Sequence, residues 1–245
     1  MKLAAALAAC LAINAPAFAQ DIPAPFEGLM LQEMHRNLMD DLRERNLGIR
    51  GDPPAKRRAQ PARSAAATGQ AVSTAYRASP QISAKVRRRF SDHMARQAGA
   101  EGGRKVAAVM AARDPVGNWA QLVAGDGLRP GDAADALAGY WVLNWMIANR
   151  GDNNRAQTLA VRDQVRAIMT SNPSYARLNE AQRQAFAEVL MLNFLVQQAA
   201  YVDALKRGDQ AALQGLGDAA VARFKSEMGV DLRRLRLTGR GFVKG

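Results

Sequence analysis

Apolar residues recur along the chain at helical spacing, and this pattern divides it into successive helical blocks. The first block, residues 26–47, has an apolar stripe at four-residue spacing, formed by Met30, Met34, Leu38 and Leu42. Gly48 and the pair Pro53-Pro54 end the pattern. We therefore predict an N-terminal helix within residues 20–48.

Residues 49–75 break the helical pattern. They hold three prolines and two glycines among Ala, Ser, Thr and Gln, with no aromatic residue. Such a segment has too little apolar area to offset the conformational entropy lost on ordering. We predict a flexible basic linker here, followed by a helical domain over residues 76–245.

Helical patterning resumes at Ser79-Pro80, where an N-cap residue precedes a proline at the first helical position. One face of the predicted helix carries Ile82, Val86, Phe90 and Met94. A short helix over Lys105–Arg113 should follow, and Asp114-Pro115 repeats the cap signal before another.

Two later blocks are apolar on nearly all sides, which is typical of helices at the centre of a fold. One begins near Asp132 or Asp135 and ends near Gly151. The other begins at Asn179, whose partner Gln182 completes a capping-box pattern, and ends at Gly208. Amphipathic blocks flank both, and only Leu232–Thr238 is ambiguous between helix and strand. The predicted fold is all-α, a single helical domain whose two central apolar helices are wrapped by amphipathic ones.

The first nineteen residues have the pattern of a secretory signal peptide. A positive start at Met1-Lys2 precedes an apolar run, and Ala17-Phe18-Ala19 is a small-x-small cleavage signal. Lipidation at Cys10 is disfavoured because the apolar run continues past it. We expect an exported protein, periplasmic or secreted, that is not transmembrane once the signal is removed. Cleavage would also remove Cys10, the one cysteine of the chain.

The net charge of +12 over 245 residues is unevenly distributed. Residues 50–105 hold 13 basic and 3 acidic side chains, whereas residues 106–231 are nearly balanced. Clustered Lys and Arg attract polyanions by releasing counterions. The candidate anion contacts in this stretch are Lys56, Arg57, Arg58, Lys85, Arg87, Arg88 and Arg89. Since the stretch has just two aromatic residues, we expect no specific nucleic-acid recognition.

The motifs of catalysis and metal binding are missing from the sequence. The two histidines, His35 and His93, lie beside apolar stripes on separate segments, which favours partly buried packing roles. We find no zinc, calcium, phosphate-loop or nucleophile motif, and we expect no metal, cofactor or catalytic residue. Helix capping explains the Asp132/Asp135 pair better than acid–base chemistry does.

Asn144 and Asn193 interrupt the two apolar helices. A buried amide without partners costs about 1–3 kcal/mol. We therefore expect each to bond to a neighbouring helix, or the two to bond to each other. A ligand pocket lined by Asn144, Tyr140 and Trp141 is the alternative.

From Tyr76 onward the chain resembles an uncharacterised family of exported bacterial helical proteins, a domain of unknown function. The matching segments are Tyr76-Arg77-Ala78-Ser79-Pro80, Val86-Arg87-Arg88-Arg89-Phe90, residues 135–145, Leu237-Thr238 and Gly241-Phe242-Val243. The resemblance extends over about residues 76–243 and implies a signal peptide, a variable spacer and a helical domain. It implies no activity and no site residues.

These observations lead to a functional expectation. We expect an exported module that is not an enzyme and that binds an unknown protein partner in the cell envelope. One alternative is a binder of anionic polymer or membrane surface acting through residues 50–105. Another is an envelope enzyme with an unrecognised carboxylate site.

Overall fold

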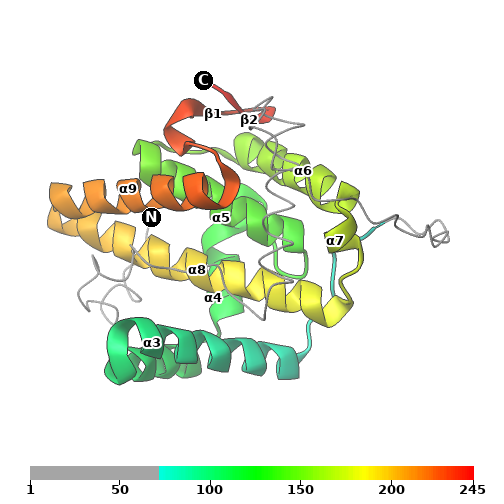
Figure 1. Ribbon diagram of the computed structural model, residues 1–245, viewed down its shortest axis with the longest axis vertical. Coiled ribbons are helices and arrows are strands. Elements are labelled where there is room, and N and C mark those ends of the chain that lie inside the picture. Colours follow the sequence, from blue (N-terminus) through cyan, green and yellow to red (C-terminus); the bar gives the residue numbers. More distant parts are fainter. Residues whose placement is uncertain (1–71) are drawn as a thin grey trace, which may run out of the picture.

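The computed structural model describes residues 72–245, except for the side chains of residues 97, 98, 227 and 228. The predicted signal peptide, the predicted helix at 26–47 and linker residues 49–71 lie outside this range. The described part is mostly helical, with one small two-stranded sheet (Figure 1). The all-α prediction is confirmed in this sense.

Two central helices organise the fold, as predicted. α5 (Ala133–Asn149) and α8 (Glu180–Arg207) pack against each other, and most side chains of α5 and half of those of α8 are buried. The Asp132 carboxylate caps α5, while Asn179 and Gln182 form the capping box that begins α8. Gly208 ends α8 in the left-handed conformation, with φ 64°. Each terminus was recognisable because capping depends on local residues.

The other helices surround this pair. α6 (Arg155–Ser171) and α9 (Gln210–Met228) pack on α5, while α3 (Pro80–Ala112) and α4 (Pro115–Val123) pack on α8. In Figure 1, α3 and α9 lie on opposite sides of α8. The short α7 (Pro173–Ala176) joins α6 to α8, and the 3-10 turns η3 (Ala124–Asp126) and η4 (Leu232–Arg234) complete the connections.

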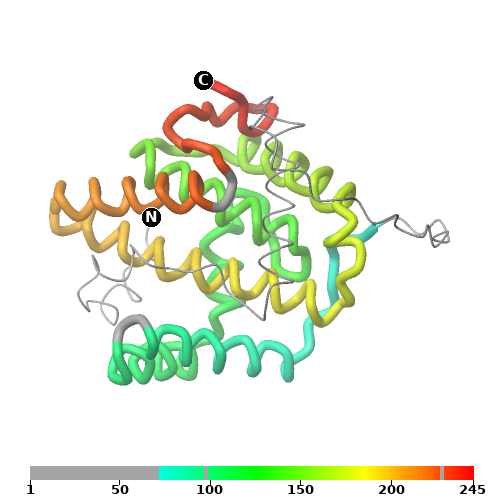
Figure 2. The backbone as a smooth tube through the Cα atoms, viewed as in Figure 1, coloured from blue at the N-terminus to red at the C-terminus, as the bar shows by residue number. Residues whose placement is uncertain are grey.

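α3 is a hairpin of two helical arms rather than one straight helix. Gly99 has φ 78° and ψ 166°, which breaks the helix and lets the chain turn back (Figures 1 and 2). The arms approach closely at Gly103, where a Cβ atom would lie 2.5 Å from the Ala95 Cβ atom. The second arm begins earlier than the helix predicted at Lys105–Arg113, because the turn needs only one non-helical residue.

The chain ends in a β-hairpin that the sequence left ambiguous. β1 (Leu235–Thr238) pairs antiparallel with β2 (Gly241–Lys244), in the register Leu235↔Lys244 to Thr238↔Gly241. Gln164 of α6 binds both backbone groups of Phe242, at 3.0 and 3.1 Å. A helix therefore supplies hydrogen bonds that a third strand would otherwise provide.

The backbone just before the predicted start of the domain at residue 76 is hydrogen-bonded to the helical body. The Thr74 carbonyl accepts a hydrogen bond from Ala133 N at 2.9 Å, and Tyr76 N donates to the Gly131 carbonyl at 2.9 Å. The Thr74 side chain is 4% exposed. The partners of Thr74 lie on α5 and α6, far along the chain. Local composition therefore could not indicate that Thr74 packs on the helical body.

Candidate functional site

The first arm of α3 carries the predicted basic residues that the structure describes. Lys85 and Arg88 are exposed, and Arg87 and Arg89 are half-buried. Residues three, four and eleven positions apart share one face of a helix. The basic row therefore consists of Lys85, Arg88, Arg89 and Arg96, whereas Arg87 lies elsewhere, with its Nε 3.4 Å from the Ser83 carbonyl. Lys56, Arg57 and Arg58 lie outside the described residues.

The buried face of the same arm forms part of an apolar cluster between α3 and α8. Val86, Phe90 and Met94 of the first arm meet Val106 and Met110 of the second arm there. Val189 and Leu192 contribute from α8. The hairpin thus presents a basic row on one side and an apolar contact with the core on another.

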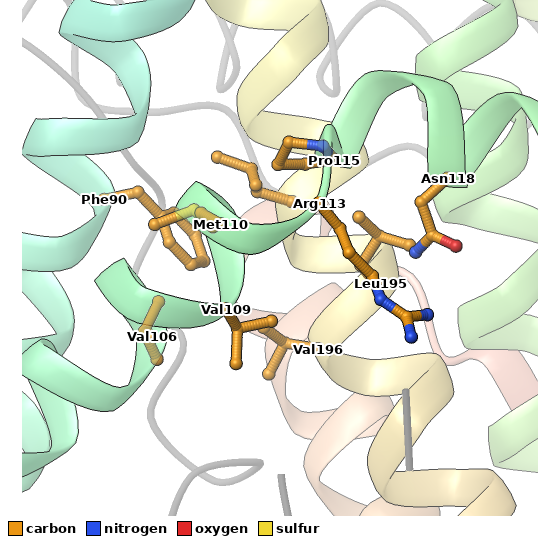
Figure 3. A pocket seen from close by; sticks show the side chains of 10 residues that line it. Phe90, Val106, Val109, Met110, Arg113, Pro115, Asn118, Leu195 and Val196 are labelled. Atoms are coloured by element: carbon orange, nitrogen blue, oxygen red, sulfur yellow. The ribbon is translucent and has the colours of Figure 1, made fainter. Parts of the chain in front are cut away.

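An apolar groove opens where the α3 hairpin meets α4 and α8 (Figure 3). Its lining consists of Phe90, Val106, Val109, Met110, Pro115, Leu192, Leu195 and Val196, with Arg113 and Asn118 as the polar residues. Figure 3 shows Arg113 and Asn118 on the same side of it. Its cavity volume of about 40 Å³ is room for about three water molecules. It suits the end of an apolar side chain better than a large ligand.

The groove was not predicted from the sequence, although the spacing of the residues that line it contains a signal. Val106, Val109, Met110 and Arg113 follow the i, i+3, i+4, i+7 spacing of one helix face. That spacing predicts a shared face, but it does not distinguish a half-covered face from a fully buried one. How much of this face is covered depends on the distance between α4 and the α3 hairpin.

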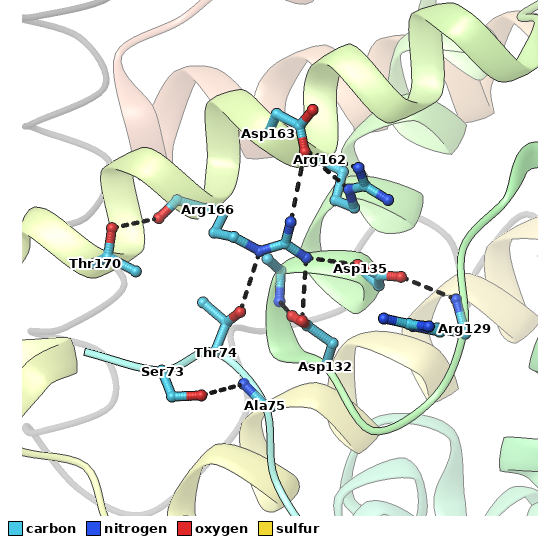
Figure 4. A network of polar contacts seen from close by, with 11 residues as sticks. Ser73, Thr74, Ala75, Arg129, Asp132, Asp135, Arg162, Asp163, Arg166 and Thr170 are labelled. Atoms are coloured by element: carbon cyan, nitrogen blue, oxygen red, sulfur yellow. Dashed lines mark hydrogen bonds and ion pairs between the residues drawn. The ribbon is translucent and has the colours of Figure 1, made fainter. Parts of the chain in front are cut away.

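A polar network joins the start of α5 to α6 and to residue 74 (Figure 4). Arg166 Nη2 donates to Asp132 Oδ2 at 3.1 Å and to Asp135 Oδ1 at 3.2 Å. The other carboxylate oxygens accept from backbone amides, Ala134 N at 2.8 Å and Arg129 N at 3.0 Å. Burial, the largest effect, raises the pKa of Asp135.

This arrangement has the properties of a structural connection. Each of the four carboxylate oxygens of Asp132 and Asp135 accepts one hydrogen bond, from Arg166 or from a backbone amide, and these bonds hold both side chains in place between α5, α6 and the preceding turn. Asp132 caps α5 as predicted, but Asp135 does not: it binds the preceding turn and Arg166. Arg166 Nε also lies 3.3 Å from Thr74 Oγ1, which links the first described residues to this network.

A second buried network holds the α3 hairpin on α8. Glu188 Oε1 accepts from Ser83 Oγ at 2.7 Å and from Gln184 Nε2 at 2.8 Å. Gln184 also binds both backbone groups of Ser79, with Oε1 2.8 Å from Ser79 N and Nε2 2.9 Å from Ser79 O. Gln184 is fully buried and Glu188 is 3% exposed. The polar residues of α8 therefore anchor the start of α3.

The two central asparagines behave differently. Asn144 is fully buried; its Nδ2 donates to the Tyr140 carbonyl at 2.8 Å, and its Oδ1 accepts from Arg223 Nη1 of α9 at 2.8 Å. The expectation of a bond to a neighbouring helix is thus confirmed for Asn144. Asn193 Oδ1 is buried without a hydrogen-bond partner among the described residues, and the bonds of the Asn144 amide go to Tyr140 and Arg223 instead of to Asn193.

His93 is half-buried on the first arm of α3, near the apolar face on which it was placed. Its Nε2 atom is buried without a hydrogen-bond partner in the described part of the chain. Burial, aided by the positive charge of Arg96, lowers the pKa of His93. His35 lies outside residues 72–245. Within that range, no group of three His, Cys, Asp or Glu side chains is placed to hold a metal ion.

Of the helices within residues 72–245, α8 alone has the length and mean hydropathy of a membrane span. Two-thirds of its most apolar window, 67%, is buried inside the fold. A core helix has the same composition, since its surroundings are also apolar.

Comparison with known proteins adds a family assignment. No curated protein and no solved structure matches the chain. One family model does match, over residues 3–244, which is a longer range than the resemblance recognised at residues 76–243. The chain belongs to this family, which is described as a Family of unknown function (DUF6683).

Proposed function

We propose that this protein is an exported, non-catalytic helical module that binds a macromolecular partner in the cell envelope through the α3 hairpin. One observation carries the proposal: the hairpin combines the basic row with the apolar groove. An apolar side chain of the partner fits the groove, and acidic residues beside it meet the basic row. Anchoring by one desolvated apolar group with charged surroundings is a common design of protein interfaces.

The chemistry of the groove supports binding over catalysis. Its lining has no carboxylate, histidine, serine, threonine or cysteine. Acid–base and nucleophilic catalysis both need such groups within hydrogen-bond reach of a substrate. The carboxylates of Asp132 and Asp135 are engaged by Arg166 and by backbone amides.

The predicted export favours a partner in the envelope. The pattern of residues 1–19 is that of a signal peptide, and the mature chain would have no cysteine. An anionic polymer or membrane surface is the second candidate partner. It is favoured by the composition of residues 80–112, which hold seven basic and two acidic side chains.

The test is site-specific photo-cross-linking in the envelope of the producing cell. A cross-linker at Val109, in the groove, should capture one dominant protein, and a cross-linker at Gln214, exposed on α9, should not. Capture at Val109 should fall at least about tenfold in the variant Lys85→Gln, Arg88→Gln, Arg96→Gln, which removes three exposed residues of the basic row, because a contact of about 1.4 kcal/mol changes affinity tenfold.

A matched variant removes the same charge elsewhere: Arg177→Gln, Arg236→Gln, Arg240→Gln. These three residues are exposed and lie outside α3. Capture should persist in this variant. Equal loss in both would show that net charge acts rather than the α3 surface. If Val109 captures no protein while heparin elution shifts only in the α3 variant, the anionic-polymer function is the correct one.

A further inference from the structure

We infer that the groove between α3, α4 and α8 is the docking site for residues 26–47 of the same chain. This inference rests on the proposed function and deepens it, because the segment would occupy the surface that binds the partner. The N-terminal segment is then an intramolecular competitor. Partner binding would require its displacement.

The segment carries apolar side chains of the kind that the groove accepts. Residues 26–47 carry an apolar stripe of Met30, Met34, Leu38 and Leu42. An amphipathic helix commonly lays such a stripe into an apolar groove. The cavity of about 40 Å³ accepts the end of one such side chain rather than a whole ligand. Methionine suits irregular cavities because its unbranched thioether adapts its shape.

The charges of the two surfaces are complementary. Residues 26–47 hold five acidic and three basic side chains, and residues 80–112 hold seven basic and two acidic ones. Asp40, Asp41 and Glu44 are the acidic residues closest to Leu42 in the sequence. With Leu38 or Leu42 in the groove, these acidic side chains would lie near the α3 hairpin, which carries Arg88 and Arg96. Such complementarity fixes orientation and raises the rate of encounter.

The intervening chain is long enough for this contact. Residues 48–71 separate the segment from the first described residue, and their composition is that of a flexible linker. A flexible chain of this length has an end-to-end distance of about 25–30 Å. Tethering of this kind gives an effective concentration of roughly millimolar. An intrinsic Kd of about 1 mM would therefore already keep the segment docked for about half the time.

The absence of cysteine from residues 11–245 permits a direct test in the full-length chain carrying Cys10→Ala. One variant adds Leu38→Cys and Val109→Cys, which places one thiol on the segment and one in the groove. The matched variant adds Leu38→Cys and Gln214→Cys on the far side of α8. Both are oxidised at low protein concentration, and the disulfide within one chain is measured by mass spectrometry.

The groove pair should form its intramolecular disulfide at least about tenfold faster than the α9 pair, since docking raises the local thiol concentration above that of a free tether. Adding Met34→Glu and Leu42→Glu to the segment should abolish the difference without changing the melting temperature. Equal rates for the two pairs would overturn the inference. Disulfides formed mainly between chains would overturn it too, because the occupant would then be a second copy.

These results are independent of the partner. If docking is found and Val109 captures no envelope protein, the proposed function fails while the docking inference stands. If docking fails and Val109 captures a partner, the opposite holds. When both are correct, the glutamate variant of the segment should increase partner capture at Val109 several-fold.

Discussion

Ser83 of α3 donates its hydroxyl to Glu188 Oε1 of α8 across 2.7 Å, although 105 residues separate them in the chain. Both side chains are at least nine-tenths buried. This bond attaches the hairpin that carries the basic row and the groove to the central helix. The candidate site therefore depends on a polar contact within the fold.

Replacing Ser83 with Ala should lower the free energy of unfolding by about 1.5–3 kcal/mol, because a buried carboxyl group loses a donor. Urea unfolding measures the change. Ser91→Ala is the matched control, since the Ser91 hydroxyl bonds only within its own helix, to the Arg87 carbonyl at 3.0 Å. It should change stability by less than about 0.5 kcal/mol. Equal effects of the two substitutions would contradict the role assigned to Ser83.

Glycine-to-alanine substitutions at two helical positions should have opposite signs. At Gly103 the new methyl group would lie 2.5 Å from Ala95 Cβ and 3.0 Å from the Ser91 carbonyl oxygen, so the arms of α3 must separate. We expect Gly103→Ala to destabilise by about 1–3 kcal/mol. At Gly215 of α9 nothing lies within 4 Å, and alanine should stabilise the helix by about 0.5–1 kcal/mol. Thermal melts of both variants provide the comparison, and a neutral Gly103→Ala would refute the close packing.

Two buried glutamines of α8 should respond in opposite ways to leucine. Gln184 makes four hydrogen bonds to Ser79, Ser83 and Glu188, so Gln184→Leu should destabilise by roughly 2–4 kcal/mol. Gln197 is 3% exposed, and its Oε1 and Nε2 have no hydrogen-bond partner among the described residues. Gln197→Leu should therefore be neutral or raise stability by about 1 kcal/mol. Both predictions are tested by the midpoint of denaturant unfolding, provided that the slope of the unfolding free energy against denaturant concentration is unchanged. A strongly destabilised Gln197→Leu variant would reveal a hydrogen-bond partner for that amide.

The Arg166 network should make stability depend on pH. Burial holds the pKa of Asp135 above its ordinary value of 3.8, so the folded state binds the proton more tightly than the unfolded state. The contribution of this group to the free energy of unfolding is complete below that ordinary value and is lost as pH rises through the raised pKa. Removing the nearby cation raises this pKa further and increases the loss at neutral pH.

Arg166→Met should therefore destabilise by about 1–3 kcal/mol near pH 7, less than for a fully buried pair because the Arg166 side chain is 36% exposed. The difference from the unmodified protein should shrink as the pH falls from about 7 to about 4. Arg207→Met is the control, since it removes exposed ion pairs to Asp203 and Asp209. Urea unfolding at several pH values in this range measures both effects. The same pH dependence in both variants would contradict the role assigned to Arg166 and Asp135.

Local signals were accurate where a helix end depends on its own residues. The capping box at Asn179 and Gln182 and the glycine stop at Gly208 were predicted and are present. Ser79-Pro80 also marks the start of α3, but the Ser79 side chain makes no cap bond. Its backbone amide binds Gln184 of α8 instead, a partner that only the packing of α3 on α8 supplies.

The amino-acid sequence by itself determined the all-α class, the two central helices, their termini and the uneven distribution of charge. These properties follow from the period of apolar residues, from capping chemistry and from composition, all of which act over a few neighbouring positions. Only the tertiary structure decided that the arms of α3 pack at Gly103, that Thr74 joins the body, and that a groove remains beside Val109. Those features depend on distances between helices, which side chains far apart in the chain set together.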